Sequence, residues 1–85
     1  MTAGSVKVVM LGRLRDVAGW RERDLAPAPS TLSALKAFLA GEDATLGEAL
    51  DGKGVQAALN KALLRGDAAL GAGDEVAFLP PMSGG

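Results

Sequence analysis

The chain has 85 residues, of which 48% are hydrophobic, and its formal net charge is −1. This length suits one small globular domain, and the balanced charge offers no basic surface for nucleic acid or an anionic membrane. Cysteine, histidine and tyrosine are all missing, which excludes disulfides, thiolate nucleophiles, imidazole bases and Cys/His metal sites. We therefore expect no metal site and no cofactor bound by this chain.

The sequence also gives no sign of a membrane segment or of a second domain. No apolar run approaches the roughly 18 residues needed to span a bilayer, and the N-terminus lacks a basic-then-apolar signal segment. No linker, internal repeat or low-complexity stretch divides the chain. We expect a cytoplasmic protein that binds neither nucleic acid nor membrane.

The first third of the chain predicts two strands joined by a short helix. Residues 6–11 are β-rich and alternate between two partly apolar faces. Residues 13–18 predict one short helical turn that Gly19 ends, and residues 21–25 predict a strand returning beside the first. Trp20, at the join, is expected to pack partly over the edge of a loop.

The middle of the chain predicts the main helix. Ser30 or Thr31 can cap a helix that runs to about Ala40 and is closed by Gly41. Residues 45–50 predict a second short helix. The apolar stripe of the main helix consists of Leu32, Leu35, Phe38 and Leu39.

The last third predicts a hairpin and a final strand. Residues 55–59 and 62–65 are expected to be strands around the Asn60-Lys61 turn, because Asn tolerates the left-handed conformation that a tight turn needs. Lys61 stands where Gly is usual. The final strand is predicted over residues 75–79, after a Gly-Asp turn signal.

An arm follows this strand. The two prolines hold its base in an extended polyproline conformation, whereas the last three residues have almost no side-chain bulk. This combination suits insertion of a terminal carboxylate into a narrow slot on another protein, although a frayed terminus is the structural alternative. The candidate tail residues are Pro80, Pro81, Met82, Ser83, Gly84 and Gly85.

Residues 73–85 resemble the C-terminus of the molybdopterin synthase small subunits, which are ubiquitin-like sulfur carriers. The likeness extends to residues 7–19, the family's opening strand and helical turn, to residues 31–35, the start of its main helix, and to residues 58–61, its hairpin. Met82 departs from the family, which more often has a β-branched residue there.

The resemblance implies an α+β, β-grasp (ubiquitin-like) fold, with a mixed sheet and one main helix packed on one face. Residues 1–79 would form the domain and residues 80–85 the tail. In the implied cycle, an E1-like activating enzyme uses ATP and Mg to adenylate Gly85, and sulfur replaces the adenylate to give a thiocarboxylate. The large synthase subunit then uses that sulfur to build the dithiolene of molybdopterin. With no catalytic side chains of its own, the chain is expected to be a carrier and not an enzyme by itself.

One helix can cover only one face of the sheet, so apolar residues on the other face call for a partner or for scattered exposure. By alternation these residues are Val9, Leu11, Leu63, Ala77 and Leu79. Three of them, Leu11, Leu63 and Leu79, fall where the resembled family packs against its large subunit. We predict that they form a partner surface near the tail.

Two other interpretations remain open from the sequence. The chain could be a related sulfur carrier for thiamine, cysteine or tRNA thiolation, although the Pro80-Pro81 base favours the molybdopterin pathway over thiamine. Alternatively, it could be a ubiquitin-like modifier or interaction module, in which Gly85 forms isopeptide bonds or carries nothing. Sequence alone does not separate these pathways.

Overall fold

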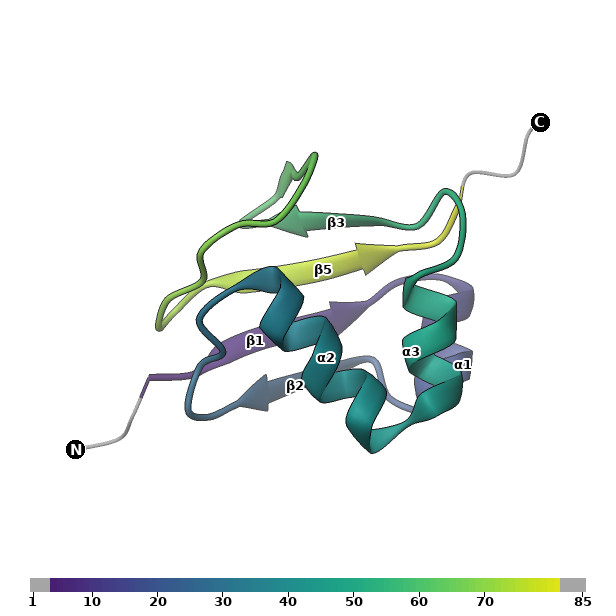
Figure 1. Cartoon of the computed structure of the whole chain (residues 1–85), viewed down its shortest axis with the longest axis horizontal. Helices are drawn as coiled ribbons and strands as arrows, with labels where there is room; N and C mark the ends of the chain where they lie inside the picture. The colour runs from purple at the N-terminus through teal and green to yellow at the C-terminus, as the bar shows by residue number, and fades with distance from the viewer. Residues whose placement is uncertain (1–3, 82–85) are drawn as a thin grey trace.

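A computed structural model of the chain describes residues 4–81 and contains one mixed sheet with three helices beside it (Figure 1). The strands are β1 (Val6–Met10), β2 (Glu22–Leu25), β3 (Gln56–Leu59), β4 (Ala62–Leu63) and β5 (Glu75–Leu79). The helices are α1 (Arg13–Ala18), α2 (Leu32–Glu42) and α3 (Ala44–Leu50). Within residues 4–81, no helix has the length and hydropathy needed to cross a bilayer.

The strand order is β2-β1-β5-β3-β4, so the first and last strands lie together in the middle of the sheet. β1 and β5 run parallel, and the other neighbouring pairs are antiparallel. Parallel neighbours need a long crossover between them. Here the crossover from β1 to β5 is the whole chain from α1 to β4, and it includes all three helices.

The helix α2 begins where the sequence predicts it. The Ala34 amide donates to Thr31 Oγ1 at 3.0 Å, and the Ser33 amide donates to Asp67 Oδ1 at 2.8 Å. Two of the free amides of the first turn are therefore satisfied, one by a local cap and one by a residue far along the chain. Thr31, rather than Ser30, is the N-cap.

The predicted end of this helix at Gly41 is wrong. α2 continues through Gly41 to Glu42, and Asp43 stands between α2 and α3. The Asp43 amide donates to the Leu39 carbonyl at 2.9 Å, while its carboxylate accepts from the Leu46 amide at 3.2 Å. One residue thus ends one helix and caps the next, so Gly41 has no need to end α2.

The core lies between the sheet and the helices. Val8, Met10, Val76 and Phe78 on the two central strands are each at most 1% exposed, which confirms the predicted alternation of β1 and β5. The complete cluster is Val6, Val8, Met10, Leu14, Leu25, Leu32, Leu35, Leu39, Leu46, Leu50, Ala57, Leu70, Val76 and Phe78. The short helix α3 contributes two of these leucines, so it helps the main helix to cover the sheet.

Phe38 does not belong to the core, although the apolar stripe included it. Leu35 and Leu39 are buried against the sheet, whereas Phe38 is 46% exposed on α2. Leu35 and Leu39 are four residues apart and share one helix face, and Phe38 lies at the edge of that face.

The hairpin after α3 confirms the predicted turn but has a shorter second strand. Asn60 and Lys61 have φ values of 50° and 74°, both left-handed. β4 ends at Leu63 instead of residue 65. The Leu64 amide still donates to the Ala57 carbonyl at 2.8 Å. The chain then leaves the sheet, and Asp67 returns to the start of α2.

Trp20 is half-buried at the join before β2, as predicted. The Arg23 guanidinium lies 5.3 Å from the centre of the Trp20 ring and donates to both Glu42 carboxylate oxygens, at 2.8 and 3.2 Å. These contacts connect the edge strand β2 to the end of α2.

Candidate functional site

The root of the tail is held by two loops. Pro80 is half-buried next to Gly12, where a Cβ added at position 12 would come within 2.7 Å of the proline Cγ. Gly54 lies against Pro81 in the same way, with 2.8 Å between a Cβ at position 54 and that of Pro81. Both glycines have positive φ, at 55° and 86°. The chain therefore leaves the domain between the loop after β1 and the loop before β3.

The remaining predicted tail residues lie outside the described part of the chain. These are Met82, Ser83, Gly84 and Gly85. Figure 1 shows β5 running toward the end of the molecule from which the tail leaves, away from the N-terminal end.

The sheet face that carries no helix has a row of apolar residues across four strands. Val9 on β1 pairs with Ala77 on β5. Ala77 also pairs with Ala58 on β3, and Ala58 pairs with Leu63 on β4. Directly paired residues point to the same face of a sheet. The register therefore joins side chains from both halves of the chain into one continuous strip.

Leu11 and Leu79 extend this strip toward the tail. The Leu11 amide donates to the Phe78 carbonyl at 3.0 Å, which holds Leu11 beside the end of β5. Leu63 is 59% exposed, Leu11 is 38% exposed and Leu79 is half-buried. We call Val9, Leu11, Ala58, Leu63, Ala77 and Leu79 the open-face patch. All three predicted partner residues belong to it.

The sequence pattern did not identify Ala58 as part of this face. Ala57 and Ala58 are adjacent small apolar residues, and both are buried. No hydrophobic contrast between them tells which faces the helices. Only the pairing of Ala57 with Phe78 and of Ala58 with Ala77 decides it.

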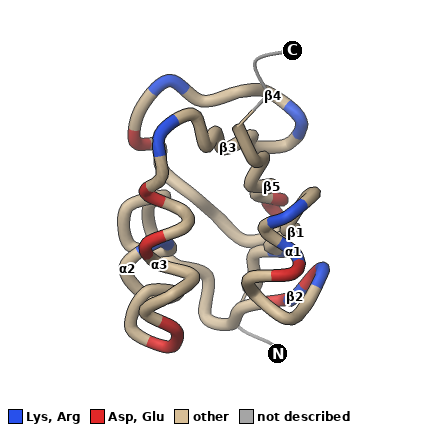
Figure 2. Tube along the Cα trace, turned by 90° about the vertical axis from the view of Figure 1, so that its right-hand side faces the viewer, with Lys and Arg blue, Asp and Glu red and all other residues tan. Residues whose placement is uncertain are grey.

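The same sheet face is charged at its other end. Lys7 pairs with Asp24 on one side and with Glu75 on the other, and its Nζ lies 3.5 Å from Glu22 Oε2. The open face is thus apolar next to the tail root and charged away from it. Elsewhere, acidic and basic positions are distributed over many elements rather than gathered in one region (Figure 2).

The carboxylates whose pKa values are lowered form hydrogen bonds within the fold. Hydrogen bonds from the Asn60 side chain and the Gly71 amide lower the pKa of Asp74. Hydrogen bonding to Ser33 lowers the pKa of Asp67, and the Arg23 hydrogen bonds lower that of Glu42. Within residues 4–81, no cluster of three acidic side chains could hold a metal ion.

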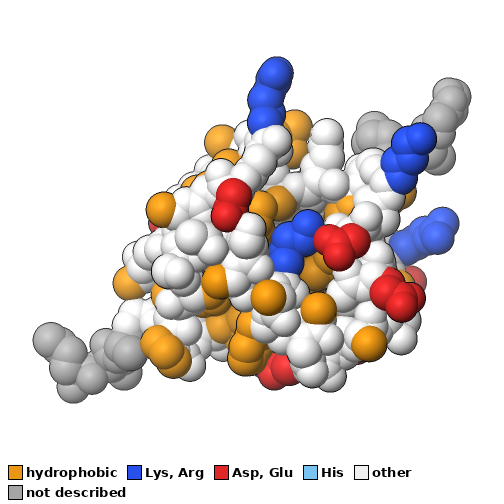
Figure 3. Space-filling view, in the orientation of Figure 1, with side chains coloured by type: hydrophobic (Ala, Val, Ile, Leu, Met, Phe, Trp, Pro, Cys, Tyr) orange, Lys and Arg blue, Asp and Glu red, His pale blue; other side chains and the backbone are white. Residues whose placement is uncertain are grey.

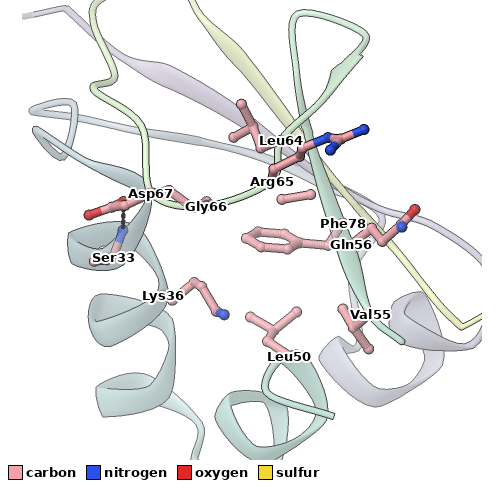
Figure 4. A pocket seen from close by; sticks show the side chains of 12 residues that line it. Ser33, Lys36, Leu50, Val55, Gln56, Leu64, Arg65, Gly66, Asp67 and Phe78 are labelled. Atoms are coloured by element: carbon pink, nitrogen blue, oxygen red, sulfur yellow. Dashed lines mark hydrogen bonds between the residues drawn. The ribbon is translucent and has the colours of Figure 1, made fainter. Parts of the chain in front are cut away.

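A hollow of about 340 Å³ lies between α2, α3 and β3. Figure 4 shows Phe78 and Leu50 at its base and the Lys36 side chain pointing into it. Lys36 Nζ is 3.2 Å from Asp51 Oδ1, and Asp67 caps α2. The polar groups of this hollow therefore stabilise the positions of the helices. We assign the hollow no catalytic role.

Known proteins are similar to this chain in both sequence and fold. The sequence profile of the ThiS family matches residues 8–85. The molybdopterin synthase sulfur carrier subunit of Escherichia coli K12 is 34% identical over 80 residues, which is 94% of this chain and 99% of the relative.

Two solved structures extend the likeness to the fold. The crystal structure of SAMP1 from Haloferax volcanii matches with a TM-score of 0.79 and 28% identity, covering 96% of this chain and all of that one. The complex of subunits 1 and 2 of the molybdopterin-converting factor from Helicobacter pylori matches with a TM-score of 0.71 and 28% identity, over 95% and 99% of the two chains. These matches confirm the β-grasp fold and the resemblance found in the sequence.

Proposed function

Because the chain belongs to the ThiS family, we propose that it is the sulfur carrier subunit of a molybdopterin synthase and that it carries sulfur as a thiocarboxylate on Gly85. The likeness to the Escherichia coli carrier subunit over 94% of the chain supports the carrier role. The observation that carries the finer proposal is the position of the open-face patch. It adjoins the tail root, so one partner can cover the patch and receive the tail together.

The chemistry that we propose needs two partners. A carboxylate is a poor electrophile, so an activating enzyme first joins it to AMP from ATP and Mg, with release of pyrophosphate. Sulfur at the sulfide level then attacks the acyl carbon and AMP leaves, which gives the thiocarboxylate without a change of oxidation state. This chain contributes the carboxylate and its positioning, while the nucleotide site and the proton-transfer groups belong to the activating enzyme.

The second proposed partner is the large subunit of the synthase. The Helicobacter pylori structure similar to this chain is a complex of subunits 1 and 2, which supports such a pairing. Leu11 and Leu63 expose apolar surface that a partner would cover. Burial of one such side chain contributes about 1.5–3 kcal/mol to association.

Deletion of Gly85 tests the carrier proposal. The shortened chain ends one residue before the predicted acceptor atom, so it should form no thiocarboxylate in a reconstituted activation assay followed by mass spectrometry. Its thermal unfolding should match that of the full chain, because the packed residues end at the tail root. Ser83→Ala, which keeps the tail length, is the control and should load normally. Normal loading of the truncated chain would overturn the proposal.

A ubiquitin-like modifier is the second candidate, and one observation favours it. The Haloferax volcanii protein matched above is a small archaeal modifier protein, and it is 28% identical with a TM-score of 0.79. Proteomic detection of lysines bearing the C-terminal residues of this chain would support conjugation. Copurification with a large synthase subunit, rather than with thiamine, cysteine or tRNA thiolation enzymes, would support the molybdopterin role.

A further inference from the structure

A small hollow lies beside the tail root, on the side away from the open-face patch. Its volume is about 220 Å³, and α1, the loop after α3 and the two prolines surround it. Its principal lining residues are Arg13, Val17, Lys53, Val55, Pro80 and Pro81, and we call it the root hollow. Val17 is 37% exposed, so the hollow combines an accessible apolar wall with two basic side chains.

The two cations of the root hollow have no structural partner in the described part of the chain. Both are exposed, and neither forms an ion pair within 4 Å among residues 4–81. Asp51, the acidic residue nearest to Lys53 in sequence, is held by Lys36 at 3.2 Å.

Their positions also bring no evident gain in stability. Arg13 is the first residue of α1, where a positive charge opposes the helix dipole. Lys53 lies in a turn between two glycines. These two charges occur in a chain of net charge −1, and basic side chains project at the C-terminal end of the molecule in Figure 3.

We propose that the root hollow is a second contact site for the large subunit, which presents an acidic side chain beside an apolar one there. This inference rests on the proposed carrier function. A protein that receives the residues after Pro81 must bring its surface close to the point where the chain leaves the domain. Arg13 and Lys53 flank that point, so they attract and orient an acidic rim around the slot.

Association kinetics with the large subunit test this inference. The double variant Arg13→Glu/Lys53→Glu should associate about tenfold or more slowly than the wild type at low ionic strength. The difference should shrink at high salt, because exposed charges are screened. The matched control is Arg21→Glu/Arg65→Glu, which changes the net charge equally. These two exposed side chains form no ion pair among residues 4–81 and belong neither to the root hollow nor to the open-face patch, so the control should stay within about threefold of the wild type.

Circular dichroism of both double variants checks that they are folded, and Arg13→Gln/Lys53→Gln provides a milder version with the same direction of effect. Equal association rates for the root-hollow variant and the Arg21→Glu/Arg65→Glu control would overturn the inference while leaving the carrier function intact. Failure of the wild type to bind the large subunit would overturn the proposed partner, and this inference with it.

Discussion

At the scale of single residues, Phe78 is the largest fully buried side chain among residues 4–81. Its side chain is 1% exposed between the sheet and the helices. Phe78→Ala should lower the free energy of unfolding by about 3–5 kcal/mol, through lost burial and the cavity left behind. Chemical denaturation measures this change.

Phe38→Ala is the matched control, because Phe38 is 46% exposed. It removes the same atoms and should cost less than about 1 kcal/mol. A comparable loss at both positions would show that the burial assigned to Phe78 is wrong.

Lys61 is a second residue whose conformation leads to a prediction. Its φ of 74° is left-handed, a conformation that costs a non-glycine residue roughly 1–2 kcal/mol. Lys61→Gly should therefore raise the free energy of unfolding by up to about 1 kcal/mol, after subtraction of the extra freedom of glycine in the unfolded chain. Thermal and urea unfolding measure the gain.

Lys53→Gly serves as the comparison, because Lys53 is not among the positive-φ residues of the described chain. Glycine there relieves no strain and increases only the entropy of the unfolded chain. If glycine at position 53 raised the free energy of unfolding as much as glycine at position 61, the left-handed φ of Lys61 would not explain the effect.

At the scale of elements, Asp74 connects the β3–β4 turn to the start of β5. Its carboxylate accepts from Asn60 Nδ2 at 3.0 Å and from the Gly71 amide at 2.8 Å, and the Glu75 amide donates to Asn60 Oδ1 at 2.9 Å. The hydrogen bonds from Asn60 and Gly71 favour the ionised carboxylate, which lowers the pKa of Asp74 in the folded state.

The sign of the pH effect follows from that lowered pKa. The stabilisation is present above the unfolded pKa of about 4 and is lost as the pH falls through the lower folded value. Asp74→Asn should therefore reduce the dependence of stability on pH between neutral and acidic solution, as measured by urea unfolding at a series of pH values. Glu48→Gln is the control, because Glu48 makes no side-chain hydrogen bond or ion pair found in residues 4–81. An unchanged pH profile for Asp74→Asn would contradict the assigned role.

At the scale of the whole molecule, the two sides of the sheet separate folding from binding. Leu63→Asp and Leu79→Asp should leave a folded monomer but sharply weaken binding to the large subunit, because an unpaired carboxylate would be desolvated at the interface. Calorimetry measures binding, and circular dichroism measures folding on the same samples.

Phe38→Asp provides the control for this pair. Phe38 is an exposed apolar residue on α2, which lies on the helix-covered side, so the substitution should leave affinity unchanged. Unfolding of both leucine variants would identify them as core residues. Undiminished binding would mean that the partner uses a different surface.

Local patterns in the sequence were sufficient for much of the fold. The alternation of residues 75–79 placed Phe78 in the core, because side chains on a strand point alternately to its two faces. The Thr31 cap and the left-handed Asn60 also follow from local chemistry. Gly41 is the exception, because whether a glycine ends a helix depends on the caps available nearby, and Asp43 provides them.

The chemistry proposed for the tail also came from the sequence, as what the resemblance of residues 73–85 to the molybdopterin synthase small subunits implies. The surfaces around the tail were decided by the tertiary structure. Ala58 joins the open-face patch only through its pairing with Ala77. Arg13 and Lys53 line one hollow only because α1 packs against α3. Register and loop proximity arise from hydrogen bonds and packing between segments far apart in the chain, which short-range periodicity does not encode.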